Sequence, residues 1–297
     1  MRTLSILFAL LVCLPAFGDA AGLGYVLKIP DSVRTVLVAE SSTATLRRFN
    51  NIDGELRLAE VQPMSIGENG VAKQRSGDRR TPLGVYFVIE ELDTRNLHEK
   101  YGPVAFPLDY PNAWDRWNAR TGHGIWIHGV EPDSGARPAR DTDGCIALQN
   151  HYLLELAPHL DPLQTPVIVT REIDTASPEQ LAEMRDRLLA ALDDWASSYR
   201  TGDWYQYLSL YSKDFMRHRM DKEEWSAYRV RTAAARPLQN FSISEVLLIA
   251  DPEDPELFLS RFRQHITEAG RVTTTAKRLY WRVAPDGQIR IIAEDNG

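Results

Sequence analysis

The spacing of apolar residues changes near Ser177, and this change limits the kinds of domain that the chain can form. Before Ser177, apolar residues form short runs that are rich in β-branched residues and separated by turn residues, which is typical of strands. After Ser177, they recur every three or four residues, which is typical of one face of a helix. With 297 residues the chain is long enough for two domains, since a domain takes roughly 100–200 residues. We therefore predict a mostly-β first domain and a second domain that begins with a long helix.

The first domain is expected to span residues 24–171. Its turn signals include Asn51-Ile52-Asp53-Gly54, which separates two of the strand-like runs. One short helix is expected over 150–156. The strands are expected at 33–39, 45–49, 56–59, 84–89, 124–128 and 167–170.

A linker at 172–178 is expected to lead into a second domain at 179–297. Its first helix has a clear start, because Ser177 can cap it, Pro178 suits its first position and Gln180 completes a capping box. Thr201-Gly202-Asp203 ends this helix, and a second helical stretch follows over 204–211. Later strands are expected at 241–249, 277–283 and 288–292, which makes this domain α+β.

The N-terminus is typical of a secretory signal peptide over residues 1–18. Arg2 precedes an apolar run from Leu4 to Val12, and small residues follow. That run is shorter than the roughly 20 residues of a membrane-spanning helix, although a membrane anchor, or a lipoprotein modified at Cys13, are alternatives. We therefore expect export to the periplasm or cell envelope. The net charge of −7 argues against a nucleic-acid partner, which would require a basic face.

Removal of the signal peptide would leave Cys145 as the single cysteine of the chain. A lone cysteine is commonly a buried core residue, but its neighbours here suit acyl transfer. A thiol needs a base to remove its proton and backbone amides to meet the oxyanion. His128 ends an apolar run and is followed by Gly129, while Gly144 permits a tight turn before the thiol. These residues predict a cysteine nucleophile with a histidine base.

Two blocks of sequence resemble the YkuD-type L,D-transpeptidase family. The first block consists of Gly124-Ile125-Trp126-Ile127-His128-Gly129 and, after a spacer, Thr142-Asp143-Gly144-Cys145-Ile146. The second block runs from Ser76 to Tyr86 and supplies Asp78, Thr81, Pro82, Gly84 and Tyr86 to the family pattern. The resemblance covers about half of the chain, and it implies a catalytic domain with an L,D-transpeptidase-like β-sandwich.

The resemblance also implies a mechanism and a substrate. Cys145 would attack the meso-diaminopimelate carbonyl of a peptidoglycan tetrapeptide stem, with His128 as its base and the Gly129 carbonyl orienting the imidazole. Backbone amides of Asp143, Gly144 and Cys145 would form the oxyanion hole, and no metal or other cofactor would be needed. The acceptor would be a second stem peptide or a lipoprotein lysine. The chain departs from the family at Asp143 and Ala147, where histidine and arginine are common.

The segment from Trp195 to Leu208, with Tyr211 and Phe215, resembles the nuclear-transport-factor-2-like (SnoaL-like) fold. This implies a smaller α+β cone-shaped domain that binds a small ligand, a glycan or a protein. The same pair of domains occurs in helical-cell-shape L,D-carboxypeptidases. Three functions stay open at this point: an L,D-transpeptidase, which we favour, an L,D-carboxypeptidase that trims tetrapeptides to tripeptides, and a non-catalytic envelope binding module.

His123 is the second histidine near the motif, five positions before His128. On a regular strand these two positions face opposite sides. We therefore expect His123 at the rim or in a structural role rather than in the same pocket as His128. The same geometry argues against a zinc site made from both histidines and Cys145.

Overall fold

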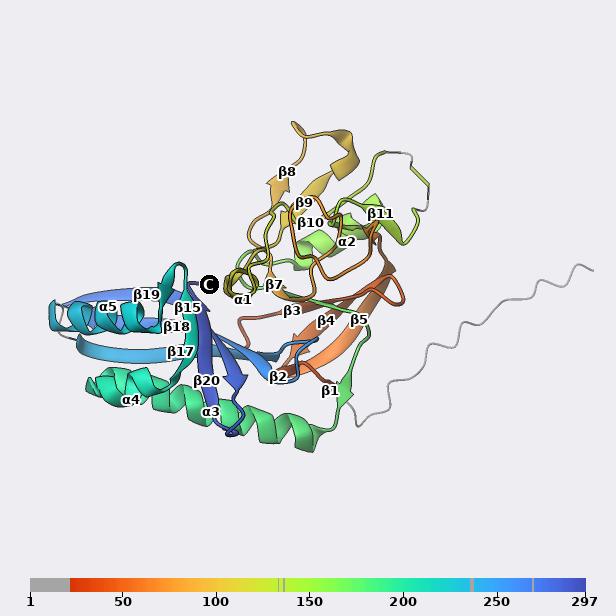
Figure 1. Cartoon of the computed structure of the whole chain (residues 1–297). Helices are drawn as coiled ribbons and strands as arrows, with labels where there is room; N and C mark the ends of the chain where they lie inside the picture. Colours follow the sequence, from red (N-terminus) through yellow and green to blue (C-terminus); the bar gives the residue numbers. More distant parts are fainter. Residues whose placement is uncertain (1–21, 133, 136, 236–237, 269) are drawn as a thin grey trace, which may run out of the picture.

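The computed structural model describes residues 22–132, 134–135, 137–235, 238–268 and 270–297, and the expected signal peptide at 1–18 lies outside them. The described chain folds as a mostly-β domain followed by an α+β domain (Figure 1). The predicted fold class is confirmed. No helix in the described ranges combines the length and the apolar character needed to cross a membrane.

A five-stranded sheet forms one layer of the first domain, with strand order β5-β4-β3-β13-β7. Its central pair is parallel, with β3 beside β13. All residues of these two strands are buried, which explains their continuous apolar and β-branched sequences. The strands are β3 (Thr35–Glu40), β4 (Thr45–Ile52), β5 (Glu55–Pro63), β7 (Gly84–Phe87) and β13 (Pro166–Thr170).

A four-stranded sheet forms the second layer, with order β12-β10-β9-β8. Ile127 and Ile146 of this sheet share a fully buried core with Leu37 and Val167 of the first sheet, so the domain is a β-sandwich. The strands are β8 (Leu92–Asp93), β9 (Val104–Pro107), β10 (Trp126–His128) and β12 (Ile146–Ala147).

Short elements connect the two layers. β6 (Ile66–Gly67) pairs with β11 (Arg140–Thr142) near the second sheet. The helix expected over 150–156 is present as α2 (Asn150–Leu156). The remaining short helices are η1 (Glu99–Tyr101), α1 (Ala113–Trp117) and η2 (Ala157–His159).

The second domain begins with α3 (Pro178–Thr201), whose first turn has the predicted capping box between Ser177 and Gln180. Gly202 ends the helix in the left-handed conformation, with φ of 73°. One face of α3 packs against β17, and Figure 1 shows the helix running along the large sheet. The elements that follow are α4 (Trp204–Ser209), β15 (Tyr211–Arg217), β16 (Met220–Asp221), α5 (Lys222–Ala235), β17 (Leu238–Ala250), β18 (Leu257–Glu268), β19 (Arg271–Val283) and β20 (Ile289–Asp295).

A seven-stranded sheet spans this domain, with order β16-β15-β20-β19-β18-β17-β2. Its last strand, β2 (Val26–Lys28), comes from the beginning of the chain and pairs antiparallel with β17. The neighbouring strand β1 (Gly22–Leu23) pairs with β14 (Thr175–Ala176). Residues from the beginning of the chain and from its last third thus build the seven-stranded sheet together. The domain limits at 24–171 and 179–297 stay predictions.

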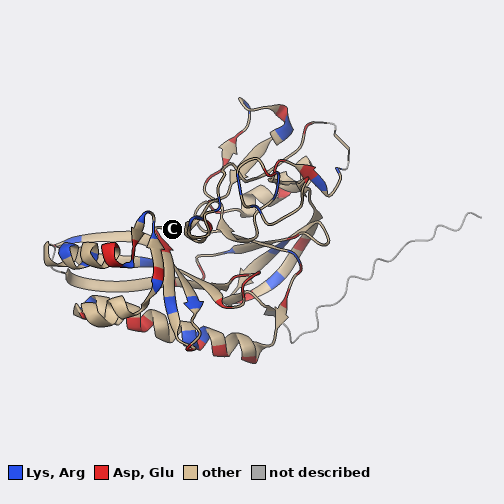
Figure 2. Ribbon diagram, in the orientation of Figure 1, with Lys and Arg blue, Asp and Glu red and all other residues tan. Residues whose placement is uncertain are grey.

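The two domains also share an apolar core. Val36 and Ile168 of the five-stranded sheet pack in one cluster with Leu247 and Tyr280 of the seven-stranded sheet. An ion pair between Arg278 and Asp109 crosses the same boundary. Acidic and basic residues are interspersed over the ribbons of both domains (Figure 2). Apolar packing, reinforced by specific ion pairs, therefore joins the domains.

Candidate active site

A cleft of about 440 Å³ opens in the first domain, and both candidate catalytic residues line it. Four parts of the chain form its walls: the segment after β6, η1, the segment that leads into β10, and the β11–β12 region. The lining residues are Glu68, Lys73, Ser76, Gly77, Arg79, Lys100, Tyr101, Gly122, His123, Gly124, Ile125, His128, Arg137, Asp141, Thr142, Asp143 and Cys145.

Strand pairing brings His128 and Cys145 into the same cleft. β10 and β12 are parallel neighbours, with Ile127 opposite Ile146. His128 is the last residue of β10 and Cys145 directly precedes β12, so this pairing brings the two residues near each other, and both line the cleft. Both residues are buried, at 5% and 9% exposure.

The Cys145 thiol donates to the carbonyl oxygen of Gly124, with Sγ 3.4 Å from the acceptor. It does not donate to His128 in this structure. Catalytic hydrogen bonds are often long or unformed before substrate binds. The sequence prediction that both side chains lie in one cleft thus agrees with the geometry, whereas their roles stay a prediction.

His128 is held in one tautomer. Its Nδ1 lies 2.6 Å from the carbonyl oxygen of Gly129. Since a carbonyl can only accept, Nδ1 carries the proton and Nε2 is left with a free lone pair. The ring of Tyr101 packs edge-on against the imidazole, with centroids 5.2 Å apart. This arrangement leaves Nε2 as the nitrogen that can accept a proton.

Gly129 itself is fixed by close packing. A Cβ at this position would lie 2.3 Å from Oδ1 of Asn150 and 3.0 Å from Cα of Gly102, so only glycine fits. The Asn150 side chain accepts the amide of Val130 at 2.8 Å and donates to its carbonyl at 3.0 Å. Sequence reasoning missed Asn150 and Tyr101, because neither belongs to a motif and both reach the site only through folding.

Burial sets the ionisation of the candidate pair. Burial raises the pKa of the Cys145 thiol to about 11, with the charge of Asp143 adding to the effect and the Trp126 backbone amide opposing it. Burial lowers the pKa of His128 to about 4, partly opposed by its bond to Gly129. Thiol and imidazole are therefore both neutral near pH 7. Proton transfer from sulfur to nitrogen must accompany nucleophilic attack.

Thr142 fixes the turn that presents the thiol. Its hydroxyl donates to the Cys145 carbonyl at 2.7 Å, and it accepts the Gly144 amide at 3.1 Å. Gly144 has φ of 127°, and a Cβ there would lie 2.7 Å from the carbonyl oxygen of Arg80. The Gly144 amide is engaged by Thr142, so an oxyanion role would require Thr142 to share or release it. The expected oxyanion hole of Asp143, Gly144 and Cys145 stays a prediction.

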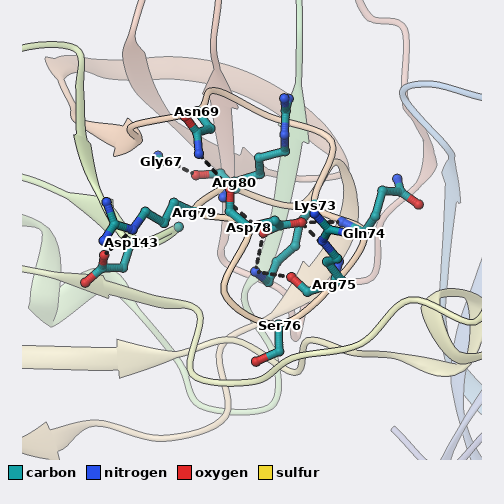
Figure 3. A network of polar contacts seen from close by, with 12 residues as sticks. Gly67, Asn69, Lys73, Gln74, Arg75, Ser76, Asp78, Arg79, Arg80 and Asp143 are labelled. Atoms are coloured by element: carbon teal, nitrogen blue, oxygen red, sulfur yellow. Dashed lines mark hydrogen bonds and ion pairs between the residues drawn. The ribbon is translucent and has the colours of Figure 1, made fainter.

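Asp78 organises the loop that forms one wall of the cleft (Figure 3). Its carboxylate accepts Lys73 Nζ at 2.7 Å and the amides of Gln74 at 2.7 Å, Arg75 at 3.0 Å and Arg80 at 3.2 Å. Burial opposes ionisation, but the Lys73 bond and the three amides lower the pKa of Asp78 to about 2. Asp78 is therefore a structural anchor of this wall.

Four other motif positions of the Ser76–Tyr86 block lie outside the cleft lining: Thr81, Pro82, Gly84 and Tyr86. Thr81 accepts the Gly67 amide through Oγ1 at 2.9 Å and so ties the loop to β6. Pro82 leads into β7, which begins at Gly84. The Tyr86 hydroxyl lies 3.0 Å from the Leu83 carbonyl, inside the protein. The supporting role expected for these four positions stays a prediction.

His123 lines the same cleft as His128, so the expectation that the two could not share a pocket is wrong. The strand starts only at Trp126, and Gly122 and Gly124 adopt positive φ. The strand alternation assumed for this segment therefore does not apply. His123 is exposed, which agrees with the expected rim position.

Comparisons with known proteins agree with this architecture. Residues 34–169 match the family model of the YkuD L,D-transpeptidase catalytic domain. Residues 187–295 match the model of the Cds6 C-terminal NTF2-like domain. The chain has no match among curated protein sequences.

Two solved structures resemble nearly the whole chain. The helical cell shape determining protein Pgp2 from Campylobacter jejuni is 25% identical, with a TM-score of 0.76, over 94% of this chain and 96% of that one. Bd1075 from Bdellovibrio bacteriovorus is 22% identical, with a TM-score of 0.75, over 93% of this chain and 98% of that one. This second likeness supports the fold and nothing further. YkuD domains are cysteine-dependent and act on peptidoglycan in the cell envelope. The chain therefore combines a YkuD-type L,D-transpeptidase catalytic domain with a C-terminal nuclear-transport-factor-2-like domain.

Proposed function

We propose that the protein cleaves the L,D bond between meso-diaminopimelate and the terminal D-alanine of peptidoglycan tetrapeptide stems, with Cys145 as nucleophile and His128 as base. One observation carries the proposal. Both residues line one cleft beside the paired strands β10 and β12, and the Gly129 carbonyl holds Nδ1 of His128 so that Nε2 can act as the base.

The reaction would proceed through a thioester. Sγ of Cys145 bonds to the diaminopimelate carbonyl carbon while its proton passes to Nε2 of His128. The tetrahedral intermediate collapses, the C–N bond breaks, and the imidazolium returns the proton to the departing amine of D-alanine. Water then attacks the thioester and gives a proton to His128, which passes it to the leaving sulfur. The products are a tripeptide stem and free D-alanine.

Water is the acceptor that we favour, which makes the protein an L,D-carboxypeptidase. The support is the resemblance along nearly the whole chain to a helical cell shape determining protein, because the same domain pairing occurs in cell-shape L,D-carboxypeptidases. Transpeptidation, which the sequence alone favoured, is the second candidate, because the YkuD model describes an L,D-transpeptidase domain. Its acceptor would be the amine of another stem or of a lipoprotein lysine.

Incubation with purified disaccharide tetrapeptides, with the products identified by mass, tests this function. The proposal predicts tripeptide and D-alanine from the wild type and neither product from Cys145→Ala. Cross-linked dimers would favour the transpeptidase. Folded wild-type protein that forms neither product would contradict both enzymes and favour a binding module.

We also propose that the protein is exported to the periplasm and that its second domain binds a ligand. A pocket of about 360 Å³ in that domain supports the second proposal, and Tyr199, Trp204 and Arg229 contribute to its lining. The Arg229 guanidinium lies 5.0 Å from the centre of the Tyr199 ring. Tyr207, in contrast, is 1% exposed and belongs to the core.

A further inference from the structure

The cleft holds four cationic side chains that the proposed reaction does not use: Lys73, Arg79, Lys100 and Arg137. Charges of both signs are scattered over the rest of the molecule (Figure 2), so these cations are not part of a general basic surface. A tetrapeptide stem carries free carboxylates at its terminal D-alanine and on the diaminopimelate side chain. A cation in the cleft could therefore orient the stem against Cys145.

Three of these cations already have a close carboxylate partner. Lys73 is buried and bonds Asp78 at 2.7 Å. Nε of Arg137 lies 2.5 Å from Oδ2 of Asp141. Arg79 pairs closely with Glu68 through NH1. Each of these partners reduces the charge that the cation can offer to a substrate.

Lys100 differs from the other three cations. Among the described residues, its one carboxylate neighbour is Asp143, and the distance from Nζ to Oδ2 is 3.8 Å. Charge-assisted hydrogen bonds of this kind are about 2.7–2.9 Å long, so no such bond forms. The Lys100 side chain is 46% exposed, and its ammonium lies 5.1 Å from the centre of the Tyr101 ring. Lys100 thus lines the cleft with little of its charge neutralised by a carboxylate.

Asp143 lies between Lys100 and Arg79 without binding either closely. Its Oδ1 is 3.6 Å from Nε of Arg79, and its side chain is 72% exposed. Figure 3 shows the Asp143 carboxylate beside Arg79 at the edge of the loop that Asp78 organises. A carboxylate therefore already occupies the space between two cations, two residues before the candidate nucleophile.

We propose that Lys100, assisted by Arg79, binds a carboxylate of the stem peptide, and that Asp143 fills this place until the substrate displaces it. The inference rests on the proposed function for the identity of the substrate. The site would accept the carboxylate of the terminal D-alanine or that of the diaminopimelate side chain, since both present the same chemistry. Lys100 is then a specificity-determining residue and Asp143 an internal competitor.

Binding to the Cys145→Ala protein tests this inference without turnover. Calorimetry would compare a free tetrapeptide with a tetrapeptide amidated at the D-alanine carboxyl and one amidated at the diaminopimelate side-chain carboxyl. Adding Lys100→Met should weaken binding of the free tetrapeptide by roughly 10- to 100-fold, as expected for loss of a hydrogen bond between charged groups. Lys100→Met should not change the affinity for the amidated peptide that lacks the carboxylate recognised by Lys100. The peptide whose affinity is unchanged therefore identifies which carboxylate Lys100 binds.

Matched variants sharpen the test. Lys100→Arg should restore most of the affinity, and Asp143→Asn should tighten binding of the free tetrapeptide. Arg137→Met, a change in the same cleft of a cation already paired with Asp141, should have a much smaller effect. Equal losses for all three peptides with Lys100→Met, or no loss for the free tetrapeptide, would overturn the inference. Wild-type protein without activity would instead overturn the proposed function, because the binding comparison does not depend on turnover.

Discussion

At the scale of single residues, the candidate nucleophile and base are both uncharged before substrate binds. Burial moves the pKa of the Cys145 thiol up to about 11 and that of His128 down to about 4. Both shifts favour the neutral forms, so the pair does not rest as thiolate and imidazolium. The protein then depends on substrate binding to bring the sulfur proton to Nε2.

The raised pKa of the Cys145 thiol predicts a spectroscopic result. A thiol with a pKa near 11 is ionised to about one part in 10⁴ at pH 7. Absorbance at 240 nm, measured against the Cys145→Ala protein as blank, should therefore show no thiolate between about pH 5 and pH 8. A thiolate signal in that range would contradict the neutral pair.

The two candidate catalytic residues were predictable from the sequence, but their supporting residues were not. Cys145 and His128 belong to motifs whose residue types and order have a chemical meaning. Lys100 and Tyr101 lie in η1, and Asn150 begins α2, so they approach the site only after the strands have paired. Nothing in their local sequence distinguishes them from surface or capping residues.

At the scale of elements, the pairing of β10 with β12 places the site, and α2 holds the end of β10. Asn150 at the start of α2 bonds both backbone groups of Val130, directly after the glycine whose carbonyl orients His128. The position of that carbonyl thus depends on a side chain from another element.

Replacing Asn150 by Ala should lower kcat more than it changes KM. It leaves the amide and carbonyl of Val130 without partners, at about 1–3 kcal/mol each if water does not replace them. It also loosens Gly129, and misplaced catalytic groups can reduce a rate by as much as 10²-fold. Steady-state kinetics on tetrapeptides measures the split between kcat and KM. Gln149→Ala is the control, because this half-buried neighbour bonds the Gly135 carbonyl rather than Val130. An equal effect of both changes would argue against the positioning role.

The Asp78 loop gives a second prediction at this scale. Asp78→Ala leaves Lys73 buried without its carboxylate, and breaking such a pair from one side costs about 3–5 kcal/mol. Denaturant unfolding should show this loss at neutral pH. The double change Lys73→Met with Asp78→Ala should recover part of the loss, because no buried charge is then left unpaired. A single variant as stable as wild type would contradict the anchoring role.

Elements with strong local signals were predicted, and those without were missed. The capping box and apolar spacing of α3 indicated both its type and its start. In α5, Trp225 is the one buried residue, so no apolar stripe marks the helix. β18 carries Arg263, Gln264 and His265 in its second half, which conceals a strand whose first six residues, Arg261 included, are all buried. Tertiary packing decided these elements.

At the scale of the whole molecule, the domains share a core and a sheet, and buried charge lies between them. Asp251 follows β17 and lines a small cavity with Gly84 and Tyr86 of the first domain and Tyr280 of the second. Burial raises the pKa of Asp251 to about 7, although the amide of Asp254 opposes the shift. The shared sheet was not predictable, because β2 has only three residues and its partner β17 lies more than two hundred positions later.

The raised pKa of Asp251 predicts how stability varies with pH. A carboxyl whose folded pKa exceeds its unfolded value near 4 stabilises the fold only while it holds its proton, and this contribution is lost as pH rises through about 7. Between pH 5 and pH 8, the free energy of unfolding should therefore fall by roughly 2 kcal/mol more for the wild type than for Asp251→Asn. Denaturant unfolding measures this difference. Asp31→Asn, at an exposed position, is the control. Parallel pH profiles for wild type and Asp251→Asn would contradict the buried-carboxyl account.

The central claim is that the sulfur of Cys145 carries the acyl group. Intact-protein mass spectrometry after incubation with a carbapenem tests it most directly, because ring opening by a nucleophile leaves the whole drug attached. The account predicts one adduct on the wild type, mapped to Cys145 by peptide analysis, and none on Cys145→Ala. Protein that is active on tetrapeptides yet forms no adduct, or forms it at another residue, would contradict the account.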